Sequence, residues 1–153
     1  MIRPTPARAA LSVAAALITL PVLATVEAHA VESSSCAAVP RTPTYSHHNS
    51  AGQKVLAYTV DLRCTLGNRT VAVNQEVLEQ DGPKSLLHVV ERRSFTVGFV
   101  SAGSTQTTFL VALPDTEEGP EEMYHRIRIQ VSSNGVTAPW TWWHASSVLA
   151  TYN

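Results

Sequence analysis

The sequence has little net charge and no cluster of basic residues. Its 11 Lys and Arg are balanced by 12 Asp and Glu, and the formal net charge is −1. A protein that grips a nucleic acid backbone needs a concentrated group of Lys and Arg. We therefore expect no nucleic acid among the partners. At 153 residues, the chain is also too short for a large multi-domain enzyme.

Recognisable catalytic and cofactor motifs are also missing. The chain contains no G-x-S-x-G nucleophile elbow, H-E-x-x-H zinc helix, P-loop or dinucleotide fingerprint. Scattered Ser, His and Asp residues could still converge after folding, because a triad is defined by its geometry and not by its order in the chain. The sequence therefore does not decide whether the protein is an enzyme, but it favours a protein without enzyme activity. We expect no cofactor.

Charged residues are absent from a long stretch near the N-terminus. Arg3 and Arg8 precede an uncharged run over residues 9–26, and an Ala-His-Ala sequence follows it. This order is typical of a secretory signal peptide. An uncleaved membrane anchor is the alternative, but Pro21 inside the run and the small-x-small site favour removal of residues 1–30. The Ala-rich leader resembles those of high-GC Gram-positive bacteria. We expect a secreted, extracellular protein with no membrane association after cleavage.

Only two cysteines are present, Cys36 and Cys64. Export would bring both into a compartment where disulfides form. A bridge between them closes a loop of about 28 residues and, in the chain-entropy model, stabilises the fold by about 3 to 4 kcal/mol. We therefore predict a disulfide, with two free thiols as the alternative.

Glycine and proline indicate a chain with many turns, because nine prolines and seven glycines disfavour long helices. Residues 31–52 are rich in Ser, Thr, Pro and His, and we interpret them as an N-terminal arm. Residues 53–153 form the predicted domain, in which apolar residues recur at every second position, the period of β-strands.

The first predicted hairpin turns at Gly67-Asn68, between two alternating segments. A two-residue turn with glycine first places Leu62 opposite Val73 and Cys64 opposite Val71. Both apolar sets then lie on one face of a shared sheet.

The last predicted hairpin turns at Asn134-Gly135, a pair typical of type I′ turns with positive φ at both central residues. Its register places Val131 opposite Ala138, and continues with Ile129 opposite Trp140, Ile127 opposite Trp142 and His125 opposite His144. Trp140 and Trp142 are then expected in the core. Pro139 cannot donate a ladder hydrogen bond, so the final strand is expected at a sheet edge.

About seven short strands joined by turns predict an all-β fold, an antiparallel β-sandwich, with a closed β-barrel as the alternative. The stretch over residues 124–135, Tyr-His-Arg-Ile-Arg-Ile-Gln-Val-Ser-Ser-Asn-Gly, resembles the penultimate strand and turn of fibronectin type III and immunoglobulin-like domains. This resemblance implies an immunoglobulin-like architecture.

Two groups of residues in the last hairpin are candidates for function. A candidate binding face combines aromatic and arginine side chains, which commonly anchor interfaces: Tyr124, Arg126, Arg128 and Trp143. In the predicted register Trp143 lies across from Arg126, where a guanidinium can stack on the indole. His125 and His144 form a weak candidate metal pair, which needs further ligands.

The sequence thus favours a non-enzymatic extracellular binding module. Its partner is expected to be an extracellular protein, a cell-wall polymer or a carbohydrate. The alternative is a small extracellular enzyme or enzyme inhibitor whose working residues lie on loops and leave no motif.

Overall fold

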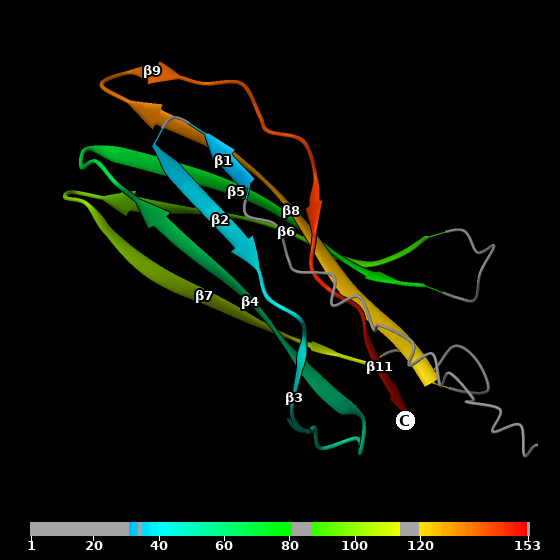
Figure 1. The fold of residues 1–153 in the computed structure, drawn as a ribbon. Helices are drawn as coiled ribbons and strands as arrows, with labels where there is room; N and C mark the ends of the chain where they lie inside the picture. Colours follow the sequence, from blue (N-terminus) through cyan, green and yellow to red (C-terminus); the bar gives the residue numbers. More distant parts are fainter. Residues whose placement is uncertain (1–30, 34, 81–86, 114–119, 153) are drawn as a thin grey trace, which may run out of the picture.

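The computed structural model describes residues 31–33, 35–80, 87–113 and 120–152. The predicted signal peptide, residues 1–30, lies outside them. All described elements are β-strands, arranged as two antiparallel sheets that face each other (Figure 1). The described strands close no barrel, so the predicted all-β sandwich is confirmed. The described part of the chain contains no helix with the length and hydropathy of a membrane span.

The first sheet, sheet A, is built around β4 (Lys54–Cys64). On one side of β4 lie β2 (Cys36–Pro40) and β3 (Thr44–His48), end to end, with β1 (Val31–Ser33) paired to the outer edge of β2. On the other side lies β7 (Gly103–Ala112), paired with β4 along its whole length. Proline explains the break between β2 and β3, because Pro40 and Pro43 have no N–H to continue the ladder.

The second sheet, sheet B, is built around β8 (Pro120–Ser133). One side of β8 pairs with β5 (Arg69–Glu79), which pairs in turn with β6 (His88–Phe99). The other side pairs with three short strands in succession, β9 (Val136–Thr137), β10 (His144–Ala145) and β11 (Leu149–Tyr152). This broken strand is the outermost in the sheet, as Pro139 predicted.

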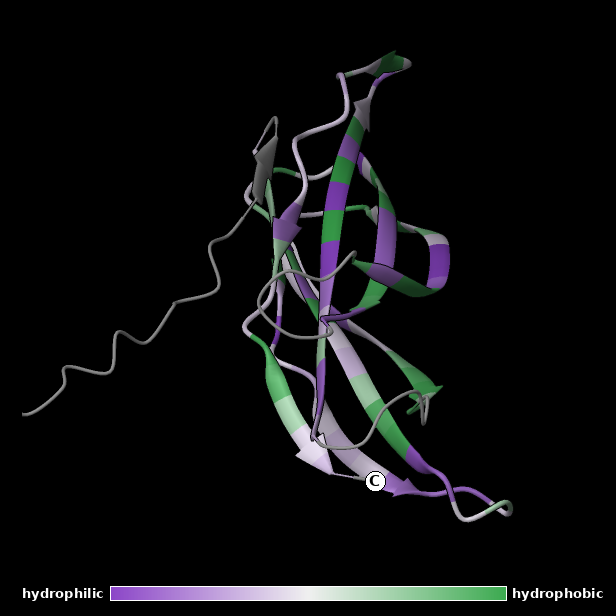
Figure 2. Ribbon diagram, turned by 90° about the vertical axis from the view of Figure 1, so that its right-hand side faces the viewer, coloured by the Kyte–Doolittle hydropathy of each residue, from purple (hydrophilic) through white to green (hydrophobic). Residues whose placement is uncertain are grey.

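The core lies between the sheets and follows the period-two pattern, visible as alternating bands of hydropathy along the strands (Figure 2). Side chains from both sheets meet in two buried clusters. One centres on Leu62, Val73 and Ile129, and the other on Leu56, Tyr58 and Met123. Full burial of each large aliphatic side chain contributes about 1.5 to 3 kcal/mol, so this interface holds the sheets together.

The predicted pairing of residues 54–64 with residues 69–79 is wrong. Strands β4 and β5 belong to different sheets, and the Gly67-Asn68 turn carries the chain from one sheet to the other. Asn68 has the positive φ, 53°, and not Gly67. A Cβ on Gly67 would lie 2.4 Å from the carbonyl oxygen of Val100, so glycine allows the close approach of two loops. Leu62 and Val73 do share the core, but from opposing sheets.

The predicted type I′ turn is confirmed, because φ is 50° at Asn134 and 79° at Gly135. The register is confirmed only beside the turn, where the N–H of Ala138 donates to the carbonyl of Val131 (2.9 Å). Beyond Pro139 the pairing shifts.

This shift overturns the rest of the predicted register. The N–H of Thr141 donates to the carbonyl of Ile129 (2.9 Å), and the Thr141 hydroxyl accepts from the N–H of Ile129 (2.9 Å). His144 then pairs with Ile127. Trp140 and Trp142 are therefore not core residues: Trp140 is half-buried, and Trp142 is 89% exposed.

The predicted disulfide is confirmed. Cys36 and Cys64 are direct cross-strand partners in β2 and β4, and their sulfur atoms are bonded. The bridge joins β2, which lies in the segment predicted as an N-terminal arm, to the end of β4, the central strand of sheet A.

Candidate binding surface

The alternation of β8 brings two arginines to the outer face of sheet B. Ile127 and Ile129 point into the core, so Arg126 and Arg128 point the opposite way. Trp140 and Trp143, from the segment between β9 and β10, lie against them. We call this outer surface the arginine–tryptophan face; its residues are Glu76, Arg92, Arg126, Arg128, Trp140 and Trp143.

Rings and guanidinium groups alternate along this face. The guanidinium carbon of Arg128 lies 5.1 Å from the ring centre of Trp140 and 4.9 Å from that of Trp143, and Arg126 lies 4.9 Å from Trp143. Such contacts are within the range of cation–π attraction. The expected contact of Arg126 with Trp143 is therefore present, although the register that led to it is different.

The Glu76 carboxylate connects arginines from two other strands. Glu76 on β5 is the cross-strand partner of Arg126 on β8 and of Arg92 on β6. Arg126 Nη2 lies 2.6 Å from Glu76 Oε2, and Arg92 Nε lies 3.0 Å from Oε1. Burial acts to raise the pKa of Glu76, but the hydrogen bonds and charges of the two arginines outweigh it, so its pKa lies below the usual value. Glu76 is therefore an anion that fixes both arginines.

Arg128 belongs to a second row of cross-strand partners, beside the row formed by Arg92, Glu76 and Arg126. Asn74 is the cross-strand partner of both Arg128 and Ser94. With its amide turned to satisfy both neighbours, Asn74 donates to Ser94 Oγ (2.8 Å) and its carbonyl accepts from Arg128 Nη2 (3.2 Å). A shallow hollow of about 260 Å³ opens over these two rows, between Arg92, Arg128 and Trp143.

Tyr124 is on the same face of β8 but does not contribute to its exposed surface. Its side chain is 8% exposed. Burial raises the pKa of its phenol, and the nearby charge of Arg126 opposes that rise. Three of the four candidate residues, Arg126, Arg128 and Trp143, are thus brought together, and Tyr124 is covered.

The two candidate metal ligands are not cross-strand partners. His125 is fully buried; its Nε2 donates to the carbonyl of Arg41 (2.6 Å), and its Nδ1 accepts from Gln75 Nε2 (2.6 Å). Burial lowers the pKa of His125 to about 4, against a smaller raising effect of the Arg41 hydrogen bond. Both ring nitrogens are therefore engaged by protein atoms. The described residues contain no group of three or more His, Cys, Asp or Glu placed to hold a metal ion.

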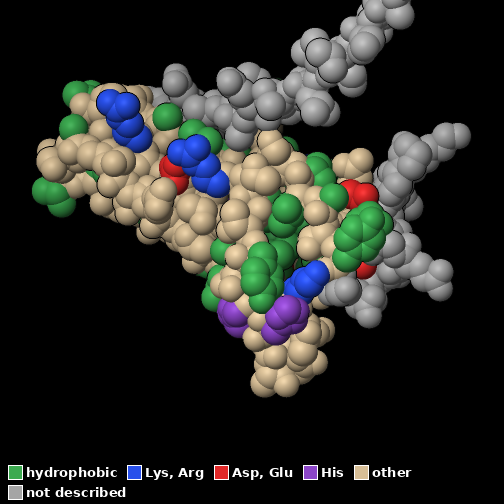
Figure 3. Space-filling model, turned by 60° about the horizontal axis from the view of Figure 1, so that its bottom comes forward, with side chains coloured by type: hydrophobic (Ala, Val, Ile, Leu, Met, Phe, Trp, Pro, Cys, Tyr) green, Lys and Arg blue, Asp and Glu red, His purple; other side chains and the backbone are tan. Residues whose placement is uncertain are grey.

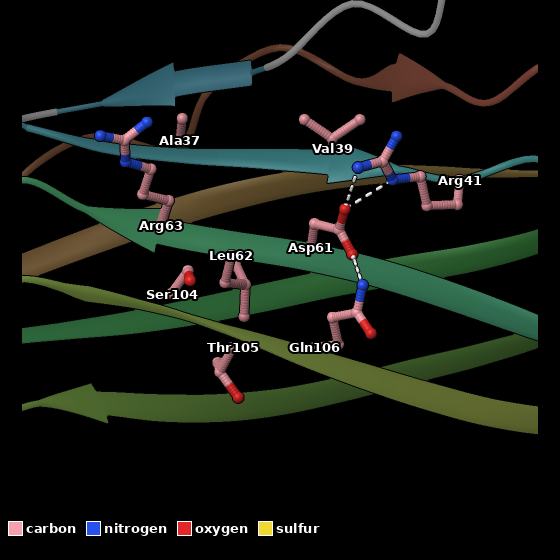
Figure 4. A pocket seen from close by; sticks show the side chains of 9 residues that line it. All are labelled: Ala37, Val39, Arg41, Asp61, Leu62, Arg63, Ser104, Thr105 and Gln106. Atoms are coloured by element: carbon pink, nitrogen blue, oxygen red, sulfur yellow. Dashed lines mark hydrogen bonds and ion pairs between the residues drawn. The ribbon is translucent and has the colours of Figure 1, made fainter.

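A second hollow, of about 540 Å³, lies on the outer face of sheet A (Figure 4). Asp61 stands at its centre, paired with Arg41 and accepting from Gln106 Nε2 (2.8 Å). Arg63 is exposed at its other end. The charged residues that line it are Arg41, Asp61 and Arg63. Figure 3 shows only scattered Lys and Arg side chains on one side of the molecule.

Comparison with family models, with curated proteins and with solved structures found no match to this chain.

Proposed function

We propose that the chain is an exported, non-enzymatic binding module with an immunoglobulin-like fold of the fibronectin type III kind. The strand order supports the fold. When the three-residue β1 is left out, and β2 with β3 and β9 with β10 and β11 are each counted as one strand, the described part of the domain has seven strands. Sheet A then holds the first, second and fifth strands, and sheet B holds the fourth, third, sixth and seventh in that order. The fourth strand pairs with the third, whereas in constant-type immunoglobulin domains it joins the other sheet. The leader pattern and the disulfide support export.

The contact surface in this proposal is the arginine–tryptophan face. The observation that carries the proposal is the ordering of three guanidinium groups, from Arg92, Arg126 and Arg128, on a face with one carboxylate, Glu76. Arg126 is held between the Trp143 ring and the Glu76 carboxylate, and Arg128 lies against the rings of Trp140 and Trp143. Guanidinium groups held in this way lose little freedom on binding, which favours affinity.

The partner proposed is an anionic extracellular polymer, such as a cell-wall polymer bearing carboxylates or phosphates. Planar guanidinium groups donate paired hydrogen bonds to both anions. A neutral sugar stacked on Trp143 is less favoured, since that ring is already in contact with Arg126 and Arg128.

The test compares binding of the oxidised chain to polygalacturonate, polyphosphate and neutral dextran by titration calorimetry. Arg128→Ala removes the guanidinium between the two rings, and Arg63→Ala removes one exposed guanidinium from the opposite sheet. We expect Arg128→Ala to weaken binding to an anionic polymer by about tenfold or more, because it removes a charge-assisted hydrogen bond to the polymer. Arg63→Ala should change the affinity by less than about twofold.

Circular dichroism and melting temperature establish that both variants are folded. Equal losses in the two variants would mean that binding follows net charge alone, and the arginine–tryptophan face would then not be the contact surface. Binding to dextran as tight as to the acidic polymers would overturn the anionic partner.

A further inference from the structure

Strand β7 is an open edge of sheet A. Among the described strands it pairs with β4 alone, and it runs along the margin of the sheet (Figure 1). The N–H of Leu113 donates to the carbonyl of Lys54 (2.7 Å) in the same register, so odd-numbered residues of β7 bond to β4. The even-numbered residues from Ser104 to Ala112 therefore direct their N–H and C=O groups away from the sheet.

The other sheet edges carry features that oppose pairing with another chain. Strand β6 has Glu91, Arg92 and Arg93 in succession and a register shift in its pairing with β5. The edge formed by β2 and β3 is interrupted by proline and partly covered by β1. The edge formed by β9, β10 and β11 is broken twice. Charge, proline, bulges and short strands are the usual protections of edge strands.

Strand β7 has none of these protections. Its ten residues, Gly-Ser-Thr-Gln-Thr-Thr-Phe-Leu-Val-Ala, include no charge and no proline, and its register with β4 has no bulge. Leu110, at its exposed face, is 48% exposed. A long, regular, uncharged edge is a template for strand addition.

We propose that β7 pairs antiparallel with β7 of a second copy of this chain, which joins two copies of sheet A into one sheet across a twofold axis. The absence of charge favours a copy of the same chain, because a twofold axis otherwise brings like charges near each other. The inference rests on β7 and is independent of the proposed binding partner.

The register follows from the outward-facing residues. Pairing that centres on Thr108 places Thr108 opposite itself, Gln106 opposite Leu110, and Ser104 opposite Ala112. This register uses every outward-facing N–H of β7 in both copies. The Thr108 hydroxyl, which bonds the Thr59 hydroxyl (2.8 Å), lies on the exposed outer face, so the side chain can be replaced without disturbing the core.

Introducing a charge at the twofold axis tests the proposal, by sedimentation equilibrium of the oxidised chain. We expect the unmodified chain to dimerise, and Thr108→Lys and Thr108→Glu each to weaken self-association by about fivefold or more, because each places like charges opposite each other. An equimolar mixture of the two variants should associate again. Thr96→Lys, the same change at an exposed position of β6, should leave self-association unchanged.

Two results would overturn the proposal. One is an unmodified chain that stays monomeric at every concentration reached. The other is a Lys and Glu mixture that associates no more strongly than either variant alone. Melting temperatures of the three variants separate loss of association from loss of folding.

Discussion

At the scale of single residues, His125 links the two sheets. Its ring forms hydrogen bonds with the Arg41 carbonyl beside β2 and with the Gln75 side chain on β5, and it makes a T-shaped contact with the buried Tyr58 ring. Its Nδ1 faces an N–H donor, so a second proton there would require the Gln75 amide to turn. The fold therefore holds the neutral imidazole with its proton on Nε2.

This preference predicts a loss of stability in acid. The pKa of His125 is about 4 in the folded chain and about 6.5 in an unfolded one. Between these values the unfolded state binds more protons, so the free energy of unfolding falls as the pH drops from about 6.5 to about 4, by about 3 kcal/mol in total from this group. Urea denaturation across this pH range measures the fall.

His125→Gln removes the titrating ring and serves as the control for other groups that titrate in the same range. Its free energy of unfolding should vary less with pH than that of the unmodified chain. The same pH dependence in both proteins would show that His125 is not the group responsible.

The candidate surface could be predicted only in part from its residues. Alternation along residues 123–131 was sufficient to place Arg126 and Arg128 on the wet face. Glu76 and Arg92 were missed because their position depends on which strands are neighbours, and no local pattern reports that. Alternation also places Tyr124 on this face, but its side chain is buried by other parts of the fold. The alternating pattern predicts the side of the strand on which a residue lies and not whether another segment covers it.

At the scale of elements, the hairpin of β8 and β9 depends on Gly135. Its φ is 79°, and no atom lies within 4 Å of the point that a Cβ would occupy, so the position is open in space but strained for a β-branched residue. Gly135→Val should lower the free energy of unfolding by more than about 1 kcal/mol. Thermal or urea denaturation measures it.

Gly98→Val is the matched control, because Gly98 also has open space around it but has no positive φ and lies within β6. Its free energy of unfolding should stay the same or rise, since valine favours strands. Equal losses in both variants would contradict the role given to positive φ.

The two turns explain which elements could be predicted. Asn134-Gly135 selects its turn by local backbone preference, so the turn and the pairing beside it were predictable. Gly67-Asn68 looks similar in sequence, but its strands join different sheets. A strand with one buried face has the same pattern whether its sequence neighbour lies beside it or across the core, so Leu62 and Val73 fit both arrangements.

At the scale of the whole molecule, export and the disulfide are tested together. The secreted protein is expected to begin at Val31, and its intact mass should rise by two hydrogens on reduction. Reduction should also lower the free energy of unfolding by about 3 to 4 kcal/mol, the loop-closure contribution of the bridge. A secreted mass that includes residues 1–30, or thiols that react before reduction, would contradict the prediction.

The crossover at Gly67 also has a kinetic consequence. Because the chain changes sheets there, the central pairings join distant segments: Tyr58 pairs with Phe109, and Val73 pairs with Ile129, each more than about fifty residues apart. Domains dominated by such non-local pairs fold in milliseconds to seconds, since loop closure precedes the contacts that stabilise it. Sheet A cannot be completed until β7 has been delivered to β4, so the Cys36–Cys64 bridge, which needs only the first part of the domain, can form before the sandwich closes.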